Sequence, residues 1–510
     1  MTILILILYI LMMIGIGVST HSKSSSIDGF VLGGRNVGSW LTAFAFGTSY
    51  FSAVVFVGYA GQFGWNYGVA ATWIGIGNAV IGSALAWIIL GKRTRSMSKH
   101  LEASTMPEFF EKRFNSKKLK TASAVIIFIF LIPYTASVYN GLSRLFSMAF
   151  NVDYSVCIIA MAVLTAVYVI LGGYAATAIN DFVQGIIMLG GIISVIIFAL
   201  NEKGGFSSVL DQLGQISDPA KNLPANSLNS LFGPDPINLI GVIILTSLGT
   251  WGLPQMVQKF YAIKDEGSIH KGTVISTIFA LVVAGGCYFL GGFGRLYSDQ
   301  IDIAANGYDS VIPTMLQNLS PGLIALVVIL VLSASMSTLS SLVIASSSTL
   351  TIDFLKGKFM KKMDDKQQLL LIRILVVVFI AISAIIALIQ YKSSVTFIAQ
   401  LMGISWGALA GAFLAPFLYS LYWKKTTKIA CWASFVFGVG LMMVNMFAKS
   451  VLPKLLQSPI NSGAIAMLAG LVIVPVVSLI TKAPDNDFVE ETFACYEKKH
   501  EVSQKTALND

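Results

Sequence analysis

The sequence predicts an all-α integral membrane protein, and three observations support this fold class. Of its 510 residues, 55% are apolar and only 12% are charged, about half the roughly 25% charge of an average soluble domain. The mean hydropathy of +0.76 indicates a surface that meets lipid rather than water. The apolar residues form continuous runs, without the period-two alternation of a lipid-facing β-barrel. This composition excludes an ordinary soluble enzyme.

About thirteen runs are long enough to be transmembrane helices, because a crossing needs roughly 20 apolar residues, with a range of about 17 to 25. No basic segment precedes the first run and no small-residue cleavage site follows it, so we expect a retained span rather than a signal peptide. The runs make a single transmembrane domain over 1–481, followed by a polar tail at 482–510. The predicted spans are 3–19, 40–62, 69–91, 121–150, 154–171, 178–200, 238–260, 272–294, 321–350, 369–390, 395–421, 428–448 and 462–481.

The distribution of Lys and Arg predicts the orientation in the cell membrane. With the N-terminus outside, 27 of the 34 basic residues fall on the inner side and 7 on the outer side, in agreement with the positive-inside rule. An odd number of spans then makes the C-terminus cytoplasmic. The net charge of +9 is explained by this orientation, so we expect no nucleic-acid partner.

The segments between the spans differ in character. The inner segment 92–120, which contains MPEFF, is interpreted as an amphipathic piece lying on the anionic leaflet. The outer segments 201–238 and 296–321 are rich in Asn, Asp, Ser, Gly and Pro, which is typical of wet loops above a vestibule.

Polar residues inside the spans point to ion chemistry. Asp181 lies just inside the sixth span, as an interfacial carboxylate or as a cation ligand; an ionised group at mid-membrane costs roughly 2.5 to 3.5 kcal/mol. The ninth span is rich in Ser and Thr, and helical spacing puts Ser337, Ser340 and Ser341 on one face. Such small hydroxylated residues let helices pack closely, and their oxygens are also what a hard monovalent cation needs, by analogy with calcium and magnesium.

Two spans carry the signs of a broken helix. The second has Gly47 among hydroxylated residues, and the seventh has Gly252 and Pro254. Irregular backbone is tolerated in a bilayer only where it lines a polar cavity, and broken helices at the midplane are the usual sites for substrate and coupling ion in secondary transporters. Because the two breaks are five spans apart, we expect two inverted five-helix repeats, at 40–200 and 238–421.

Five motifs follow one another along the chain: LGGRNVG (32–38), GTSYFSAVVFVGYAG (47–61), GGYAATAINDFVQGIIML (172–189), GLPQ (252–255) and SASMSTLSS followed by TIDF (333–354). In this order they resemble the sodium/solute symporter family, which includes proline, pantothenate, sialic acid and sodium/glucose carriers. The resemblance implies a leucine-transporter-type fold with an extra N-terminal helix, Na⁺ as coupling ion, a small-molecule solute as cargo, and a carrier that works as a monomer in the lipid bilayer.

The resemblance also implies where sodium binds. The first sodium site would use main-chain oxygens and hydroxyls of Thr48, Phe51, Ala334, Ser337 and Thr338. Some members have a second sodium site, made of an aspartate and further hydroxyls, whose positions are occupied here by Asp181, Ser340 and Ser341.

The same resemblance narrows the solute. Proline carriers have an aspartate where this chain has Tyr50, sugar carriers have a polar residue where it has Val55, and sialic acid carriers use an arginine in the fourth span that 122–142 lacks. TSYFSA and GLPQ are most similar to the pantothenate carriers, which favours a small carboxylate or amino acid over sialic acid or another sugar-like solute. Pocket candidates, each more often a packing residue when taken alone, are Ser49, Ser52, Thr250, Trp251, Gln255 and Gln400, with Trp406 as a gate.

These features predict sodium-coupled uptake by alternating access. A membrane sensor on the same scaffold would need a signalling domain, for which the tail is too short. An intramembrane enzyme would need a nucleophile with a base, and all four histidines lie in predicted loops or the tail without a paired carboxylate. An ion channel fits less well, because midplane sites in broken helices favour occlusion over continuous conduction.

Overall fold

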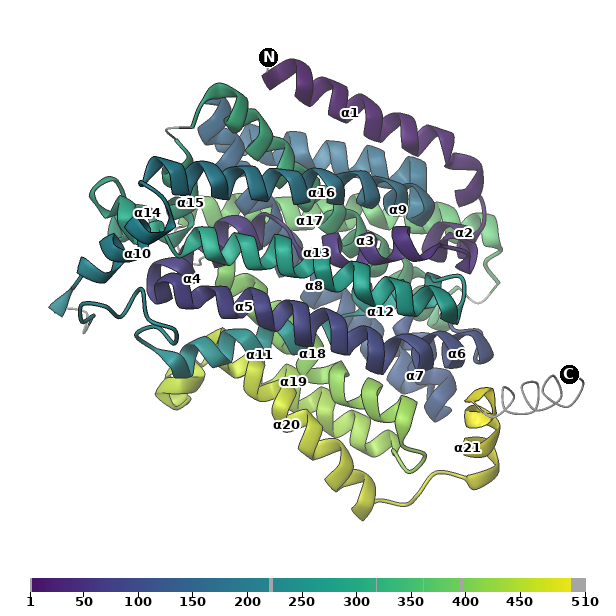
Figure 1. Cartoon of the computed structure of the whole chain (residues 1–510). Coiled ribbons are helices and arrows are strands. Elements are labelled where there is room, and N and C mark those ends of the chain that lie inside the picture. Colours follow the sequence, from purple (N-terminus) through teal and green to yellow (C-terminus); the bar gives the residue numbers. More distant parts are fainter. Residues whose placement is uncertain (1, 220–222, 318, 361, 394–397, 497–510) are drawn as a thin grey trace, which may run out of the picture.

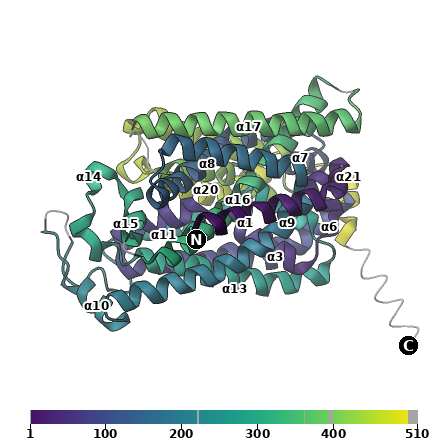
Figure 2. The same cartoon turned by 90° about the horizontal axis from the view of Figure 1, so that it is seen from above.

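The computed structural model describes residues 2–219, 223–317, 319–360, 362–393 and 398–496. Within these ranges the chain is helical, with two isolated bridges and no strand, so the all-α prediction is confirmed. Most long helices run along one common direction (Figure 1). Seen from above, α17 and α13 lie at opposite edges and α1, α9 and α16 lie between them (Figure 2).

Seven of the long helices keep a regular α-helical backbone over their whole described length. They are α1 (Thr2–Ser19), α8 (Lys117–Phe150), α13 (Glu266–Gly291), α17 (Asp365–Ser393), α18 (Ile398–Tyr422), α19 (Lys428–Phe447) and α20 (Pro459–Ile480). Shorter α-helices connect or cap them. These are α2 (Ile27–Leu32), α7 (Met106–Phe114), α10 (Phe206–Gln215), α14 (Ile303–Asn306), α15 (Val311–Leu316) and α21 (Asn486–Phe493).

Other helices change geometry along their length. One stretch runs from α5 (Thr72–Gly77) through two π-helical segments into α6 (Lys92–His100). The helix α16 (Pro321–Thr349) likewise continues as a π-helical segment, Leu350–Lys356. The helix α9 (Tyr154–Glu202) turns at Gly173, whose φ of 54° is a left-handed conformation that glycine adopts without steric cost.

The predicted count of thirteen spans is not confirmed. Among the described residues, nine helices are long and apolar enough to cross a membrane, or ten if one bent pair is a single span. The count is lower partly because α9, with 49 residues, covers two predicted spans. At 1.5 Å per residue such a helix is about 70 Å long, more than twice the hydrocarbon thickness of about 30 Å. Thirteen therefore stays a prediction, and residues 395–397 of the eleventh predicted span lie outside the described residues.

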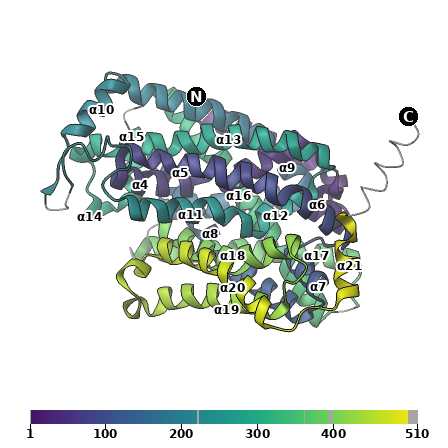
Figure 3. The ribbon, with the colours of Figure 1, turned by 60° about the horizontal axis from the view of Figure 1, so that its bottom comes forward.

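The centre of the bundle is formed by α16 and α18, the two most completely buried of these long helices. The first helix, α1, packs on α9 and α16. There the hydroxyl of Tyr9 accepts hydrogen bonds from Gln184 (2.9 Å) and Ser333 (3.0 Å). The helices α19 and α20 pack on one side of α18, with α11 next to α18 and α20 (Figure 3).

The segment that contains MPEFF was predicted to lie on the anionic leaflet. For the apolar face of its helix, this prediction is wrong. In α7, Phe109 and Phe110 are fully buried and pack against Phe413 and Phe417 of α18. Arg113 is also buried and donates to the carbonyl of Ser420 at 3.0 Å. Protein rather than lipid covers this aromatic face, because it packs against the C-terminal half of α18.

Candidate sodium and solute site

The first predicted break is confirmed at Phe51. The helix α3 (Ser39–Tyr50) ends there, because Phe51 has an extended backbone with φ −92° and ψ 120°. A π-helical segment, Val54–Tyr59, and then α4 (Ala60–Tyr67) continue the chain. Val55 and Phe56 both donate their N–H groups to the carbonyl of Ser52, so the restarted helix does not use the carbonyl of Phe51.

The residues of the first predicted sodium site converge on one hydroxyl. Oγ1 of Thr338 lies 3.3 Å from the carbonyl oxygen of Thr48, 3.0 Å from that of Phe51 and 3.1 Å from that of Ala334. Ser337 donates to Oγ1 of Thr48 at 2.7 Å. A hydroxyl has one proton and can satisfy only one of three carbonyls at a time. The other carbonyl oxygens face inward with lone pairs that lack a donor. A desolvated cation bound among them would stabilise this arrangement. We call these five residues the carbonyl cage.

The cage is shielded from solvent and lipid. The side chains of Ser337, Ser340 and Thr338 are fully buried, and Ser341 is 4% exposed. The serine face therefore points into the protein, towards α3 and α9, as the sequence predicts. Among the residues searched, no group of three or more His, Cys, Asp or Glu side chains could hold a metal, so the cage offers neutral oxygens rather than a transition-metal ligand set.

A second polar cluster lies beside the cage and contains two charged side chains, Asp181 and Lys259. Asp181, on α9, is fully buried, and neither oxygen of its carboxylate has a hydrogen-bond partner among the described residues. Lys259 donates to Oγ of Ser341 at 3.0 Å, and Ser341 in turn lies 2.8 Å from Oγ of Ser49. Of the three residues predicted for a second sodium site, Ser341 is thus hydrogen-bonded to a lysine, Ser340 donates to the carbonyl of Ser337 at 2.9 Å, and Asp181 keeps both carboxylate oxygens without a hydrogen-bond partner in the described part of the chain.

Sequence reasoning missed Lys259 as a site residue. It lies at the edge of the seventh predicted span, so it was counted with the inner basic segment, yet only 2% of it is exposed. The signal was present in the helix pattern, because Lys259 follows Gln255 by one helical turn and shares its inward face.

The second predicted break is confirmed at Leu253. The helices α11 (Pro236–Gly252) and α12 (Pro254–Ala262) meet at an angle of 46°, and Leu253 between them is extended, with φ −81° and ψ 125°. Trp406 of α18 lies between the two breaks. Its ring is 6.3 Å from that of Tyr50, and a Cβ on Gly249 would come within 2.5 Å of it.

The other predicted pocket residues divide into two groups. Thr250 donates to the carbonyl of Gly82 at 2.8 Å, and Trp251 donates to that of Ile81 at 2.9 Å. Ser49 donates to Ala45 and faces Ser341 rather than Trp406. These three side chains therefore already have partners, which favours packing for them.

The second group is Ser52, Gln255 and Gln400. The hydroxyl of Ser52 accepts a hydrogen bond from the N–H of Val54 at 3.2 Å. Gln255 is fully buried, and neither of its amide atoms has a hydrogen-bond partner among the described residues. Gln400 is partly buried in the first turn of α18.

A group of buried tyrosines around Trp406 was not predicted. The hydroxyls of Tyr50 and Tyr59 have no hydrogen-bond partner in the described part of the chain. The ring of Tyr50 lies 6.3 Å from that of Trp406, and the ring of Tyr134 lies 5.8 Å from it. Buried phenols normally find a partner, so these hydroxyls are candidates for solute contacts. The sequence signal that could have identified these residues is a tyrosine in the middle of an apolar span.

Two hollows lie at the end of the molecule where the predicted outer loops gather. One, of ≈ 780 Å³, is lined by residues of 303–317 and by Arg144, and the other, of ≈ 480 Å³, is lined by residues of 223–242. Arg144 lies 3.9 Å from the carboxylate of Asp309. Burial raises the pKa of the Asp309 carboxyl, and the positive charge of Arg144 opposes that rise.

At the opposite end of the molecule, an ion-pair network lies at the C-terminal end of α16. Asp353, which is 1% exposed, accepts a hydrogen bond from Thr105 at 2.7 Å. Lys120 lies 3.6 Å from Asp353 and 2.8 Å from Glu111. This network joins α7, the start of α8 and the end of α16.

Comparison with known proteins gives a family match over most of the chain. Residues 30–438 match the model of the sodium:solute symporter family. An osmoregulated proline transporter of Bacillus subtilis is 28% identical over 91% of this chain and 91% of its own length. A sodium/proline symporter of Staphylococcus aureus is 31% identical over 82% of this chain and 81% of its own length.

Solved structures agree at the level of the fold. A sodium-coupled sialic acid symporter, solved in a substrate-bound outward-open state, superposes with a TM-score of 0.75 at 15% identity, over 95% of this chain and 98% of that one. A manganese transporter of Eremococcus coleocola superposes less closely, with a TM-score of 0.51 at 12% identity, over 87% of this chain and 94% of that one. Both neighbours are leucine-transporter-type transporters.

Proposed function

The chain belongs to the sodium:solute symporter family, and from this premise we propose that it imports a small amino acid or carboxylate together with sodium by alternating access. A member of this family is a multi-pass membrane transporter with Na⁺ as its coupling ion. The chain accordingly acts as a carrier and not as an enzyme.

The observation that carries the proposal is the carbonyl cage, because its oxygens come from two different helices. Thr48 and Phe51 belong to the broken span, whereas Ala334, Ser337 and Thr338 belong to α16. A sodium ion bound there would bridge the two elements and stabilise the conformation in which the solute pocket next to Tyr50 is complete. Each charge carried inward by the ion gains about 2.3 kcal/mol per 100 mV of membrane potential.

Three features support a small amino acid or carboxylate as the solute. Two helix N-termini begin near the pocket, one after Phe51 and one at Pro254, and their partial positive charge favours a carboxylate. Trp406 and the tyrosines offer apolar faces with a few polar tips, which suits a small, partly apolar molecule. The relatives named above are proline carriers, although Tyr50 stands where those proteins are expected to have an aspartate.

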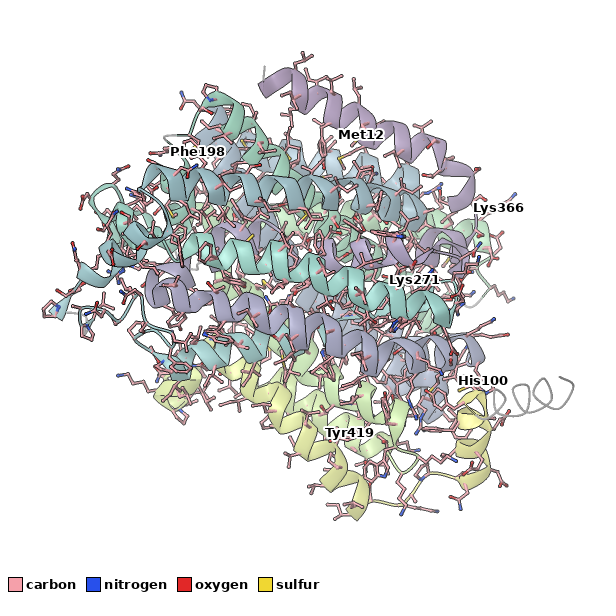
Figure 4. The ribbon with its side chains drawn as sticks, in the orientation of Figure 1. Met12, His100, Phe198, Lys271, Lys366 and Tyr419 are labelled. Atoms are coloured by element: carbon pink, nitrogen blue, oxygen red, sulfur yellow. The ribbon has the colours of Figure 1, made fainter. Side chains whose placement is uncertain are left out.

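The same proposal includes the repeats, the domain boundary, the oligomeric state and the orientation in the membrane. We assign the inverted repeats to 40–200 and 238–421, with one transmembrane domain over 1–481 and a monomer as the working unit. His100, Lys271 and Lys366 come from the end of the molecule that carries α21, and Phe198 comes from the opposite end (Figure 4). This gathering of basic residues supports a cytoplasmic C-terminus and an outer N-terminus. Residues 497–510 of the tail lie outside the described residues.

Uptake into proteoliposomes tests the proposal. Purified protein would be reconstituted and given an inward sodium gradient, with an equal potassium gradient as control. Labelled amino acids including proline, small carboxylates, sialic acid and sugars would be offered in turn. We expect concentrative uptake of one amino acid or carboxylate in sodium only. Uptake of sialic acid or a sugar would overturn the solute class, and equal uptake in potassium would overturn sodium coupling.

A further inference from the structure

The short helix after the last long helix carries an inference that rests on the proposed alternating access and extends it. The helix α21 and the 3₁₀ turn that follows it, Ala494–Tyr496, lie beside α6 and α7 (Figure 3). We propose that this segment, 486–496, is a strap that holds the inner end of the carrier closed and releases part of its contacts whenever the inner side opens.

Two hydrogen bonds and an arginine hold the strap on α6. Nε2 of His100 donates to the main-chain carbonyl of Glu491 at 2.9 Å, and the hydroxyl of Tyr496 donates to the carbonyl of Arg93 at 3.1 Å. The guanidinium of Arg93 lies 4.6 Å from the centre of the Tyr496 ring and 4.1 Å from that of Tyr422 at the end of α18. Cation–π contacts of this kind are favourable, so one arginine joins the strap, α6 and α18.

A second set of contacts joins the strap to α7 and to the segment just after α18. Phe493 and Val489 are each 4% exposed, and the ring of Phe493 lies 5.0 Å from the guanidinium of Arg113 on α7. Glu490 forms an ion pair with Lys424, with 2.5 Å between Oε2 and Nζ. Burial of the apolar side chains supplies most of the stabilisation, because an exposed ion pair contributes little.

The strap crosses the boundary between the two proposed repeats. The helix α6 continues the helical stretch that begins with α5 in the first repeat, whereas α18 is the last long helix of the second. In transporters built from such repeats, alternating access is largely a movement of one part of the molecule against the other. Their inner ends must therefore shift relative to each other when the inner side opens, and a segment bound to both ends cannot keep all of its contacts.

The strap is docked in a conformation whose inner path is closed. Beyond the carbonyl cage, along α16 and the π-helical segment that follows it, the side chains of Ser348, Thr349 and Asp353 are only 1%, 3% and 1% exposed. Water on the inner side therefore does not reach the cage along this face of α16. The contacts of the docked strap stabilise this closed conformation, and inner opening has to overcome the part of them that it breaks.

The reaction rate of a cysteine on the closed inner path tests the proposal in the purified full-length chain. Ser348→Cys places a thiol there, and a water-soluble maleimide reaches it only when the path opens. All proteins also carry Cys495→Ser, because that thiol is only partly buried. In sodium-free medium we expect Phe493→Ala/Tyr496→Ala to raise the labelling rate by about tenfold or more, because the strap loses both of its ring contacts.

The matched control is Asp487→Asn, an exposed position on the same helix, which should label at the unaltered rate. An unchanged rate in Phe493→Ala/Tyr496→Ala, in protein whose melting curve shows that it is folded, would overturn the strap. An equal acceleration in Asp487→Asn would do the same, because it would not depend on the docking contacts.

Should the double variant not fold, Tyr496→Ala alone replaces it. We expect it to speed labelling by roughly threefold or more, with Tyr496→Phe between it and the unaltered chain, because the phenylalanine keeps the ring on Arg93 and loses one hydrogen bond. Identical rates in all three would contradict the proposal. Sodium should slow labelling in every variant. A rate that does not respond to sodium would instead count against the proposed sodium coupling, since the strap is judged from the sodium-free rates.

Discussion

The carbonyl cage and the charged cluster are neighbours on α16, but they hold positive charge in different ways. The cage consists of neutral oxygens, three of them within 3.3 Å of a single Thr338 hydroxyl, and under the proposed function it binds a sodium ion that arrives from outside. The cluster already contains a buried positive charge, because Lys259 donates to Ser341 at 3.0 Å and lies 4.9 Å from the ring of Tyr174. The cage therefore offers neutral oxygens alone, whereas the cluster includes charged side chains.

The two regions therefore predict different effects of substitution: a change in the cluster affects the stability of the fold, and a change in the cage affects sodium binding. Removing a charge from the cluster leaves the opposite charge buried, and the whole fold loses free energy. Removing an oxygen from the cage weakens the binding of sodium but leaves no charge behind. The following substitutions test that distinction, beginning with the largest expected effect.

Asp181→Asn should lower the free energy of unfolding by roughly 3–5 kcal/mol, because the ammonium of Lys259 would remain buried without its counter-charge. Denaturant or thermal unfolding in detergent measures the change. Asp181→Asn/Lys259→Gln is the matched control and should lose clearly less. Equal losses in the single and the double variant would mean that the two charges do not stabilise each other.

Thr338→Val should raise the sodium concentration for half-maximal uptake by about tenfold or more, since it removes the hydroxyl at the centre of the cage while keeping the side-chain shape. A lost hydrogen bond to a charged group is worth roughly 1.5–3 kcal/mol. Thr338→Ser restores the hydroxyl and should behave almost like the unaltered protein. Sodium titration of uptake in proteoliposomes is the measurement, and an unchanged titration for Thr338→Val would remove this residue from the site.

Gly249→Ala should raise the solute concentration for half-maximal uptake by roughly tenfold, because a Cβ there would lie 2.5 Å from the ring of Trp406 and overpacking costs about 1–3 kcal/mol. Sodium binding should change less, since the cage lies on the other broken span. Gly190→Ala is the control, as nothing lies within 4 Å of a Cβ at that position. Similar kinetics for both variants would argue against a solute pocket at Trp406.

Arg144→Gln should have the smallest effect, lowering the free energy of unfolding by about 1 kcal/mol or less. Its distance of 3.9 Å from Asp309 is long for an ion pair, and its side chain is one-third exposed. Thermal unfolding at low and high salt measures the effect, which should shrink as salt rises. A salt-independent loss of several kcal/mol would show that this contact is far stronger than its geometry indicates.

The sequence was sufficient to predict both breaks and the inward serine face. Glycine beside competing hydroxyls at Gly47 and proline at Pro254 act locally on helix geometry, so their effect can be inferred without the neighbours. The orientation of Ser337, Ser340 and Ser341 follows from helical periodicity together with the cost of exposing hydroxyls to lipid.

Features that depend on a distant partner were not predictable in the same way. Lys259 was expected with the inner basic segment, because a lysine at the end of a span usually extends its ammonium to the interface. Its buried ammonium donates to Ser341, 82 positions later in the chain. Phe109 and Phe110 gave the pattern of a surface helix, and only the shape of α18 decides that protein covers them.

The account depends most on the claim that the cage binds sodium, and the thermal stability of the purified protein tests this claim directly. A ligand that binds only the folded state raises the melting temperature with its concentration. We expect the melting temperature to rise with sodium but not with potassium in the unaltered chain, and to lose this sodium response in Ser337→Ala/Thr338→Val. An undiminished sodium response in that double variant would contradict the account.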